Sequence, residues 1–183
     1  WERFAELGLL ALRVPEDCGG IGGTAVDTML VMECLGKGLV LEPYLACAVL
    51  ANTLVNAAGT PEQKQSLLRP AAEGRLLLAA ALYEPEARYA LNRVTTTAEV
   101  AANGWRISGK KALVLGGPSA DTFIVAARTS GDADAAEGIS LFLVERGTPG
   151  LDVRAYRTHD GTHAADIALR SVEVDHFALL GPA

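Results

Sequence analysis

The residues with the clearest potential for chemistry stand in one stretch, Ala79–Tyr89. Its small apolar start, Ala79–Ala81, predicts a buried strand that a flat ligand or another backbone can approach closely. Glu84-Pro85 ends this strand, because proline fixes φ and removes a hydrogen-bond donor. The guanidinium of Arg88 suits a phosphate or a carboxylate, and a solvated loop arginine is the alternative. The stretch is a candidate binding site, although spacing alone does not establish one.

Other residues that could take part in chemistry show weaker sequence patterns. The four glycines in Cys18–Gly23 demand a loop, and a phosphate cradle is conceivable there. However, no Lys-Ser/Thr pair follows this segment and no dinucleotide fingerprint fits it. His159, His163 and His176 lie in or near turns without the partner spacing of a metal or acid–base site. We therefore expect no metal site and no histidine chemistry.

Composition limits the class of protein. The chain has 183 residues, of which 50% are hydrophobic, and its net charge is -6. It has no basic tract for nucleic acid and no apolar run of the roughly 20 residues that span a membrane. Its three cysteines share no metal-ligand spacing, which favours free thiols in a reducing cytoplasm. The chain opens with Trp1 rather than Met, so we expect it to be a fragment.

The first part of the chain, residues 1–75, carries helix signals. Thr24 and Thr60 each begin a capping box. We expect helices over 25–35, 43–58 and from 61 to the glycine at 74. The helix over 25–35 is apolar almost all round, which predicts that it is buried. Residues 1–75 are therefore predicted to form a helical domain.

The second part, residues 76–183, carries strand signals. Residues 94–100 alternate in polarity, which predicts a strand. Asn103-Gly104 predicts a hairpin turn, and residues 105–108 would form its second strand. Further strands are predicted over 111–115, 122–128, 139–145, 167–169 and 172–174. Short strands separated by turns, without helices between them, predict an antiparallel barrel or sandwich. The fold class is thus α+β, with a helical domain followed by a β-domain.

Several short phrases resemble a known family, and they occur in the family's order over nearly the whole chain. They are Leu7-Gly8-Leu9-Leu10, Pro15-Glu16, Gly19-Gly20, Gly59-Thr60-Pro61-Glu62-Gln63-Lys64, Glu84-Pro85, Gly109-Lys110-Lys111, Ala120-Asp121, Gly138–Val144, Thr148-Pro149-Gly150, Val172-Glu173-Val174 and Leu180-Gly181. Together they resemble the N-terminal and middle domains of an acyl-CoA dehydrogenase. The Arg88-Tyr89 pair is similar to the small-subunit type of pimeloyl-CoA and steroid side-chain acyl-CoA dehydrogenases.

The resemblance implies a chemistry. Family members bind FAD and an acyl-CoA between the middle domain and a C-terminal helical bundle, which is expected beyond Ala183 together with the catalytic carboxylate. It implies cofactor contacts at Leu82, Tyr83, Leu113, Val114 and Leu115, and substrate contacts at Arg88 and Tyr89. It also implies an electron-transfer flavoprotein or similar acceptor and a homo- or hetero-tetramer. This chain is then expected to hold no catalytic residue of its own.

Three departures from the family pattern leave alternatives open. Tyr83 replaces the usual threonine, the usual Gly-Ser-Asp is lost around Arg88-Tyr89-Ala90, and Leu113-Val114-Leu115 lacks the usual aromatic ring and hydroxyl. Backbone amides at Tyr83 and Leu115 remain available for a flavin. The chain can be part of an FAD-dependent dehydrogenase, or a non-catalytic subunit that completes a partner's flavin site. An acyl-CoA oxidase or flavin monooxygenase on the same fold is a further alternative.

Overall fold

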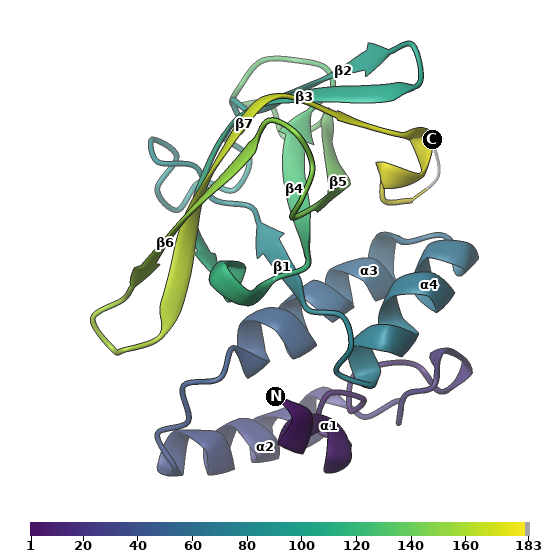
Figure 1. Cartoon of the computed structure of the whole chain (residues 1–183), viewed down its shortest axis with the longest axis vertical. Coiled ribbons are helices and arrows are strands. Elements are labelled where there is room, and N and C mark those ends of the chain that lie inside the picture. The colour runs from purple at the N-terminus through teal and green to yellow at the C-terminus, as the bar shows by residue number, and fades with distance from the viewer. Residues whose placement is uncertain (182–183) are drawn as a thin grey trace.

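The computed structural model describes residues 1–181, so residues 182 and 183 of the predicted β-domain lie outside the description. Helices occupy the first part of the chain and strands the second, as predicted (Figure 1). The main helical elements are α1 (Glu2–Glu6), α2 (Ala25–Lys37), a π-helix η2 (Tyr44–Ala51), α3 (Asn52–Ala58) and α4 (Pro61–Ala72). None of the helices within residues 1–181 has the length and apolar character that crossing a bilayer requires.

Both predicted capping boxes are present. The Thr24 side chain accepts a hydrogen bond from the Asp27 amide, and the Thr60 side chain accepts one from the Gln63 amide. The acidic or amide side chain in each box bonds back to the cap backbone, so two free donors are satisfied at each helix start. The predicted helix over 43–58 is divided into the π-helix η2 and the α-helix α3. Although π-helical turns are rare overall, many of those that occur lie at functional sites.

The prediction that the helix over 25–35 is buried is wrong. No residue of α2 is buried, and Val26, Met29 and Leu30 are all more than half exposed. The opposite side of α2 does pack, through Val31 and Met32, on a small cluster around Leu10 and Tyr44. An apolar sequence shows that a helix favours burial, but the described chain supplies packing partners for only one side of it.

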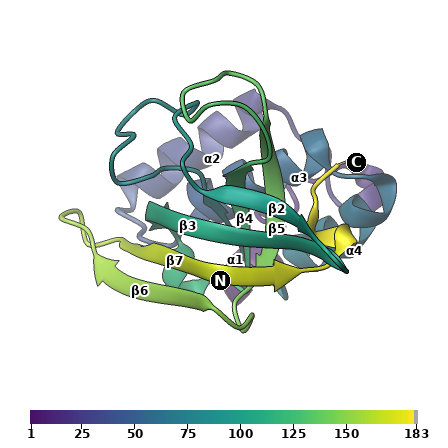
Figure 2. The ribbon, with the colours of Figure 1, turned by 90° about the horizontal axis from the view of Figure 1, so that it is seen from above.

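The strands form one curled, mixed sheet. They are β1 (Leu78–Ala81), β2 (Thr97–Ala101), β3 (Gly104–Leu115), β4 (Thr122–Arg128), β5 (Ile139–Glu145), β6 (Leu151–Arg157) and β7 (His163–Val174). The order is β1-β4-β2-β3-β7-β6, with β5 also paired to β4. Figure 2 shows β2, β3, β7 and β6 as one curved layer. Most pairs are antiparallel as predicted, but β1 runs parallel to β4, and β2 meets β4 in parallel at Thr97 and Arg128. Parallel pairing of β1 and β4 is possible because a long excursion separates the two strands in sequence.

Several strand boundaries differ from the prediction. Residues 105–108 and 111–115 belong to one strand, β3, whose register shifts at two irregularities. Residues 167–169 and 172–174 likewise belong to the single strand β7. Strand β6 was not predicted, although Leu151 to Arg154 alternates in polarity as a half-buried strand does. Residues 94–96 precede β2 rather than forming part of it, because they bond to Glu84, Arg128 and the 129–138 loop.

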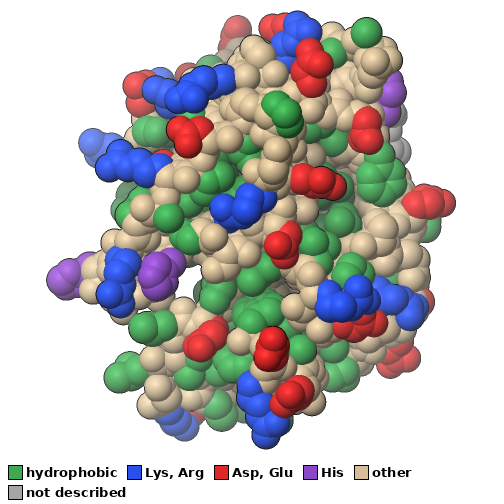
Figure 3. All heavy atoms as spheres, viewed as in Figure 1, with side chains coloured by type: hydrophobic (Ala, Val, Ile, Leu, Met, Phe, Trp, Pro, Cys, Tyr) green, Lys and Arg blue, Asp and Glu red, His purple; other side chains and the backbone are tan. Residues whose placement is uncertain are grey.

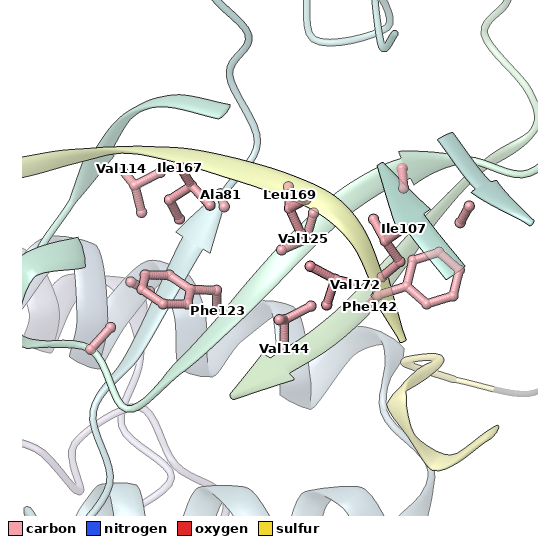
Figure 4. Close-up of a cluster of buried hydrophobic side chains, with 14 residues drawn as sticks. Ala81, Ile107, Val114, Phe123, Val125, Phe142, Val144, Ile167, Leu169 and Val172 are labelled. Carbon is pink, nitrogen blue, oxygen red and sulfur yellow. The ribbon is translucent and has the colours of Figure 1, made fainter. Parts of the chain in front are cut away.

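Two hydrophobic clusters meet at β4. Inside the curled sheet, Phe123 and Val125 pack with Val114, Ile167 and Phe142 (Figure 4). Ile124, which lies between Phe123 and Val125 on β4, instead joins a cluster with Leu68 of α4 and Val55 of α3. Because successive side chains of a strand point to opposite faces, β4 is buried on both sides. The helical part and the sheet therefore share a core, and the proposed division at residues 75 and 76 remains a prediction.

Candidate functional site

The two segments predicted to hold a flavin lie side by side. Strand β1 ends at Ala81, and the carbonyl oxygen of Tyr83 then accepts a hydrogen bond of 2.9 Å from the amide of Ala112 on β3. This bond joins the Glu84-Pro85 turn to the strand that carries Leu113 and Leu115. The structure therefore brings together two segments that are about thirty residues apart in the chain.

The buried side chain of Glu84 stabilises this junction from the protein interior. Its carboxylate is buried and accepts hydrogen bonds from the Thr95 amide and hydroxyl and from the Thr96 amide. It also pairs with Lys111 Nζ at 2.8 Å, where both side chains are almost fully buried. Burial by itself would raise the pKa of Glu84, but the hydrogen bonds from Lys111, Thr95 and Thr96 outweigh it and lower that pKa to about 2. Glu84 is thus held as a carboxylate and is unsuited to act as a general base.

A bulge shapes β3 directly beside this junction. The pairing with β7 shifts between Lys111 and Val114, and Leu113 has a φ of 52°, which is unusual for leucine. The carboxylate of Asp166 on β7 accepts hydrogen bonds from the Leu113 amide at 3.4 Å and the Tyr156 hydroxyl at 3.0 Å. Burial, followed by the hydrogen bond to Asp166, raises the pKa of Tyr156. Asp166 therefore holds the bulge in place from the neighbouring strand.

The bulge determines which side chains of β3 reach the surface. Tyr83, Leu113 and Leu115 are 40%, 46% and 44% exposed, whereas Val114 is 1% exposed. Figure 4 shows Val114 among the core side chains, close to Ile167. Leu82 is half-buried. Of the five predicted cofactor-binding residues, three therefore present side chains, while Val114 has only its backbone to offer a ligand.

The predicted substrate-binding residues lie in the loop that follows this junction. Arg88 and Tyr89 lie in the loop after Pro85, where Arg88 has a φ of 50° and Tyr89 is 95% exposed. Within residues 1–181, no hydrogen bond or ion pair joins either side chain to Tyr83, Leu113 or Leu115. Both side chains are exposed and accessible to a ligand, and their role in substrate binding stays a prediction.

Arg128, at the end of β4, joins this loop to a second one. Its buried guanidinium donates to six backbone carbonyls, namely those of Asn92, Val94, Ser130, Ala133, Ala135 and Glu137. Figure 2 shows both loops extending from the same side of the sheet. An ion pair between Arg93 and Asp134, at 3.3 Å, adds a contact at the surface. The loop that carries Arg88 and Tyr89 is therefore anchored by Glu84 at its start and by Arg128 at its end.

A groove of about 370 Å³ opens between the helical part and the end of β3. Its walls are mostly apolar and include Met32, Leu35, Val40, Leu41, Leu45, Leu50 and Leu115, while Asp160, Thr162 and His163 of the β6–β7 hairpin form a polar rim. Figure 3 shows the hollow beneath this hairpin, with hydrophobic side chains around it. Since Leu115 lines the groove and Ala112 bonds to Tyr83, one strand connects the groove to the flavin segments.

A close contact between backbone and side chain forms one end of the groove. Gly116 has a φ of +71°, and a Cβ placed on it would lie 2.5 Å from the Sγ of Cys47. Cys47 belongs to η2 and is buried, which raises the pKa of its thiol to about 12. The glycine therefore lets the π-helix pack against the turn after β3, and the thiol there is inert.

Sequence reasoning missed the residues that position the site. Lys111 and Arg128 are buried cations, and nothing in a single sequence distinguishes them from solvated ones. The groove itself combines segments that are far apart in the chain, so no local pattern indicates it. The sequence does predict a strand over 122–128, which the structure confirms, but it does not indicate that the arginine at its end is buried.

Comparison with known proteins identifies the family. The model of the acyl-CoA dehydrogenase middle domain matches residues 79–174, and the model of the N-terminal domain of the same family matches residues 1–75. The chain belongs to the acyl-CoA dehydrogenase family. The resemblance seen in the sequence is therefore confirmed, and so is the fold class.

Individual relatives agree with this assignment. The mitochondrial long-chain specific acyl-CoA dehydrogenase of Rattus norvegicus is 33% identical over 192 residues, covering 99% of this chain and 43% of its own length. The ChsE4-ChsE5 complex of Mycobacterium tuberculosis contains a chain that is 30% identical, with a TM-score of 0.85, over 100% of this chain and 47% of that one. The FAD complex of PigA is 28% identical, with a TM-score of 0.87, over 100% of this chain and 49% of that one. The chain thus spans about half the length of these relatives.

The residues around Tyr83 are compatible with part of a flavin. Family membership and the FAD complex of a relative both point to FAD as the cofactor. Tyr83, Leu113 and Leu115 present apolar surface suited to the face of an isoalloxazine ring. The polar edge of the ring needs donors, and with the family's usual hydroxyls absent the donors that remain are backbone amides and the Tyr83 hydroxyl.

Proposed function

We propose that the protein catalyses the flavin-dependent α,β-dehydrogenation of an acyl-CoA thioester, to which this chain contributes a wall of the flavin site and a groove for the acyl group. The observation that supports this most is the continuity of β3. At Ala112 the strand is bonded to Tyr83, and at Leu115 it lines the apolar groove. A flavin ring and an acyl group must be adjacent for a hydride to pass between them.

The chain's own residues would bind and orient rather than react. Tyr83, Leu113 and Leu115 would contact the flavin with their side chains, and Leu82 and Val114 with their backbones. FAD, when bound, supplies the hydride acceptor. Arg88 and Tyr89 would meet the CoA moiety, because an exposed guanidinium can pair with a phosphate. The base that removes the α-proton would come from outside residues 1–183, as the family resemblance implies.

The Asp160 carboxylate at the rim of the groove supports a binding role for this chain and a base from elsewhere. Asp160 accepts hydrogen bonds from the Thr158 hydroxyl and from the amide and hydroxyl of Thr162, which lower its pKa. A carboxylate that is stabilised in this way is a poor acceptor of an α-proton. Because a negative charge stands at its rim, the groove favours an apolar acyl group, such as a fatty or steroid-derived one, over a dicarboxylic one.

The proposal can be tested on the full-length protein, purified with any partner subunit. The purified protein should be yellow, and its flavin absorbance should bleach on anaerobic addition of an acyl-CoA. Leu115→Asp should lower flavin content and turnover at least about tenfold, because it places a charge where the ring and acyl group would pack. Val100→Asp on β2 is the matched control, since Val100 is also apolar but is 76% exposed and outside the groove. Wild-type flavin content and turnover in Leu115→Asp would refute the proposal.

The acyl groove can be tested separately by filling it. Leu45 lines the groove and is 54% exposed, so Leu45→Trp should fold and should narrow the groove. We expect kcat/KM to fall for long acyl-CoA substrates by about tenfold and to change little for short ones, because only the long acyl groups need the filled volume. An equal effect on all chain lengths would show that the acyl group does not lie in this groove.

A second candidate is a non-catalytic subunit that completes the flavin site of a partner. The replacement of the family's hydroxyl and aromatic residues at Tyr83, Leu113 and Leu115 favours it, and one similar structure is the ChsE4-ChsE5 complex. The full-length chain alone would then be colourless, and flavin would bind only after a partner is added. A yellow chain that turns over without a partner would exclude this alternative.

Assembly and location follow from the same proposal. We propose a homo- or hetero-tetramer, which the apolar side chains exposed on α2 support. An electron-transfer flavoprotein or a similar acceptor would reoxidise the flavin. The free thiols of Cys18, Cys34 and Cys47 support a reducing compartment such as the cytoplasm.

A further inference from the structure

We infer that Glu84 and Lys111 are positioning residues whose buried ion pair sets the separation of the two walls of the flavin site. This inference rests on the proposed function for the flavin, but its geometric part stands without it. Glu84 directly follows Tyr83, and Lys111 directly precedes Ala112. The ion pair of 2.8 Å and the Tyr83–Ala112 hydrogen bond of 2.9 Å therefore connect the same two segments side by side.

The two segments have few other connections at this point. The pairing of β1 with β4 ends at Ala81, and Pro85 has no amide hydrogen to donate. On the other segment, the register of β3 with β7 is interrupted between Lys111 and Val114. Where the regular ladders stop on both sides, the Glu84–Lys111 pair is the side-chain link that supports the Tyr83–Ala112 hydrogen bond between the walls.

The ion pair contributes more to the relative orientation of the two segments than to the stability of the fold. The Glu84 carboxylate is fixed by Thr95 and Thr96 as well as by Lys111, so its oxygens have defined positions. Glu84 is the one hydrogen-bond partner of Lys111 Nζ within the described residues. A buried ion pair contributes little net stability compared with an apolar pair of similar volume, because both charges lose their water. Its specific geometry is what an apolar pair would not reproduce.

In a double variant of Lys111 and Glu84, the stability of the protein and the positioning of the two walls should respond differently. In the full-length protein, with its partner subunit if it has one, Lys111→Met leaves the Glu84 carboxylate buried and unpaired. Adding Glu84→Gln removes that charge and should restore at least half of the lost resistance to denaturant. Deuterium exchange at the Ala112 amide should nevertheless stay at least about tenfold faster than in the wild type, and flavin should bind at least about tenfold more weakly.

The matched control is the exposed pair Arg106–Glu173, which joins β3 to β7 at 2.9 Å. Arg106→Met combined with Glu173→Gln should change neither Ala112 exchange nor flavin affinity, since exposed pairs contribute little. Because the variants at Lys111 can fail to fold, Thr95→Val provides a milder test. It removes one hydrogen bond to Glu84 and should accelerate Ala112 exchange by a smaller factor.

Each outcome decides the question. If Ala112 protection and flavin affinity recover in step with stability in the double variant, the pair is only structural and the inference is overturned. If the double variant does not fold and Thr95→Val leaves Ala112 exchange unchanged, the inference is also overturned. If the wild-type protein binds no flavin but Ala112 exchange responds as expected, the positioning role holds and the proposed function fails instead.

Discussion

Every residue of β4 is buried, whereas no residue of α2 is. Both segments are rich in apolar side chains, so composition does not explain the difference. Strand β4 lies between two clusters, with Phe123 facing the interior of the sheet and Ile124 facing α3 and α4. Helix α2 packs through one side only and leaves Met29 and Leu30 exposed. Apolar character shows that an element favours burial, and the neighbours available to it decide how much burial it achieves.

The largest expected effect tests the buried side of this comparison. Phe123→Ala should lower the free energy of unfolding by about 3–5 kcal/mol, because Phe123 is fully buried and its removal leaves a cavity. Denaturant unfolding, followed by circular dichroism, measures it. Phe177→Ala is the control, since that ring is 50% exposed and should cost much less. Equal losses in the two variants would contradict the packing described for β4.

A second prediction concerns acid sensitivity in the two regions. The pKa of Glu84 is about 2 in the folded protein and about 4.5 when unfolded, so its contribution is complete above the unfolded value and is lost as pH falls toward 2. Glu84→Gln should therefore cost on the order of 3 kcal/mol at neutral pH, since one pKa unit corresponds to about 1.4 kcal/mol. The cost should shrink as pH falls through this window, because wild-type Glu84 becomes neutral there.

The corresponding variant on α2 sharpens the contrast. The hydrogen bond from Thr24 also lowers the pKa of Asp27, but Asp27 stands at the solvated start of that helix. The unfolding free energies of wild type, Asp27→Asn and Glu84→Gln can be measured from pH 7 to pH 2. The free-energy cost of Asp27→Asn should change less with pH than the cost of Glu84→Gln. A larger pH dependence at Asp27 would place the acid-sensitive contacts in the helical part instead.

The smallest expected effect belongs to the exposed side of α2. Met29 is 58% exposed, so Met29→Ala should change the unfolding free energy of this chain by no more than about 0.5 kcal/mol. The same denaturant experiment checks it. A loss of several kcal/mol would show that this face is covered in solution, for example by self-association, which a repeat at lower protein concentration would reveal.

Much of the architecture could be predicted before any coordinates. The capping boxes at Thr24 and Thr60 located two helix starts, because a cap is a local hydrogen-bond pattern. The bounds of β4 and β5 were also predicted correctly, because apolar runs between turns are local signals. Strand β6 was missed, and β3 was divided in two, since Ser108-Gly109 reads as a break and the pairing with β7 carries the strand through it.

The site was less predictable. The order of motifs indicated Tyr83 and Leu113–Leu115, and the structure places these segments next to each other. It did not indicate that Val114 faces the core, because a bulge at Leu113 changes the alternation of the strand. Nor did it indicate the anchoring role of Arg128, whose six acceptors are backbone carbonyls in two different loops.

The sequence by itself determined the family, the succession of helices and strands, and the turn at Glu84-Pro85, because each depends on residues that are close together in the chain. Only the tertiary structure decided that Glu84 meets Lys111, that β3 connects Tyr83 to the groove, and that one face of α2 stays exposed. These features depend on contacts between distant segments. Their energies come from burial and from directional bonds, which a linear pattern does not contain.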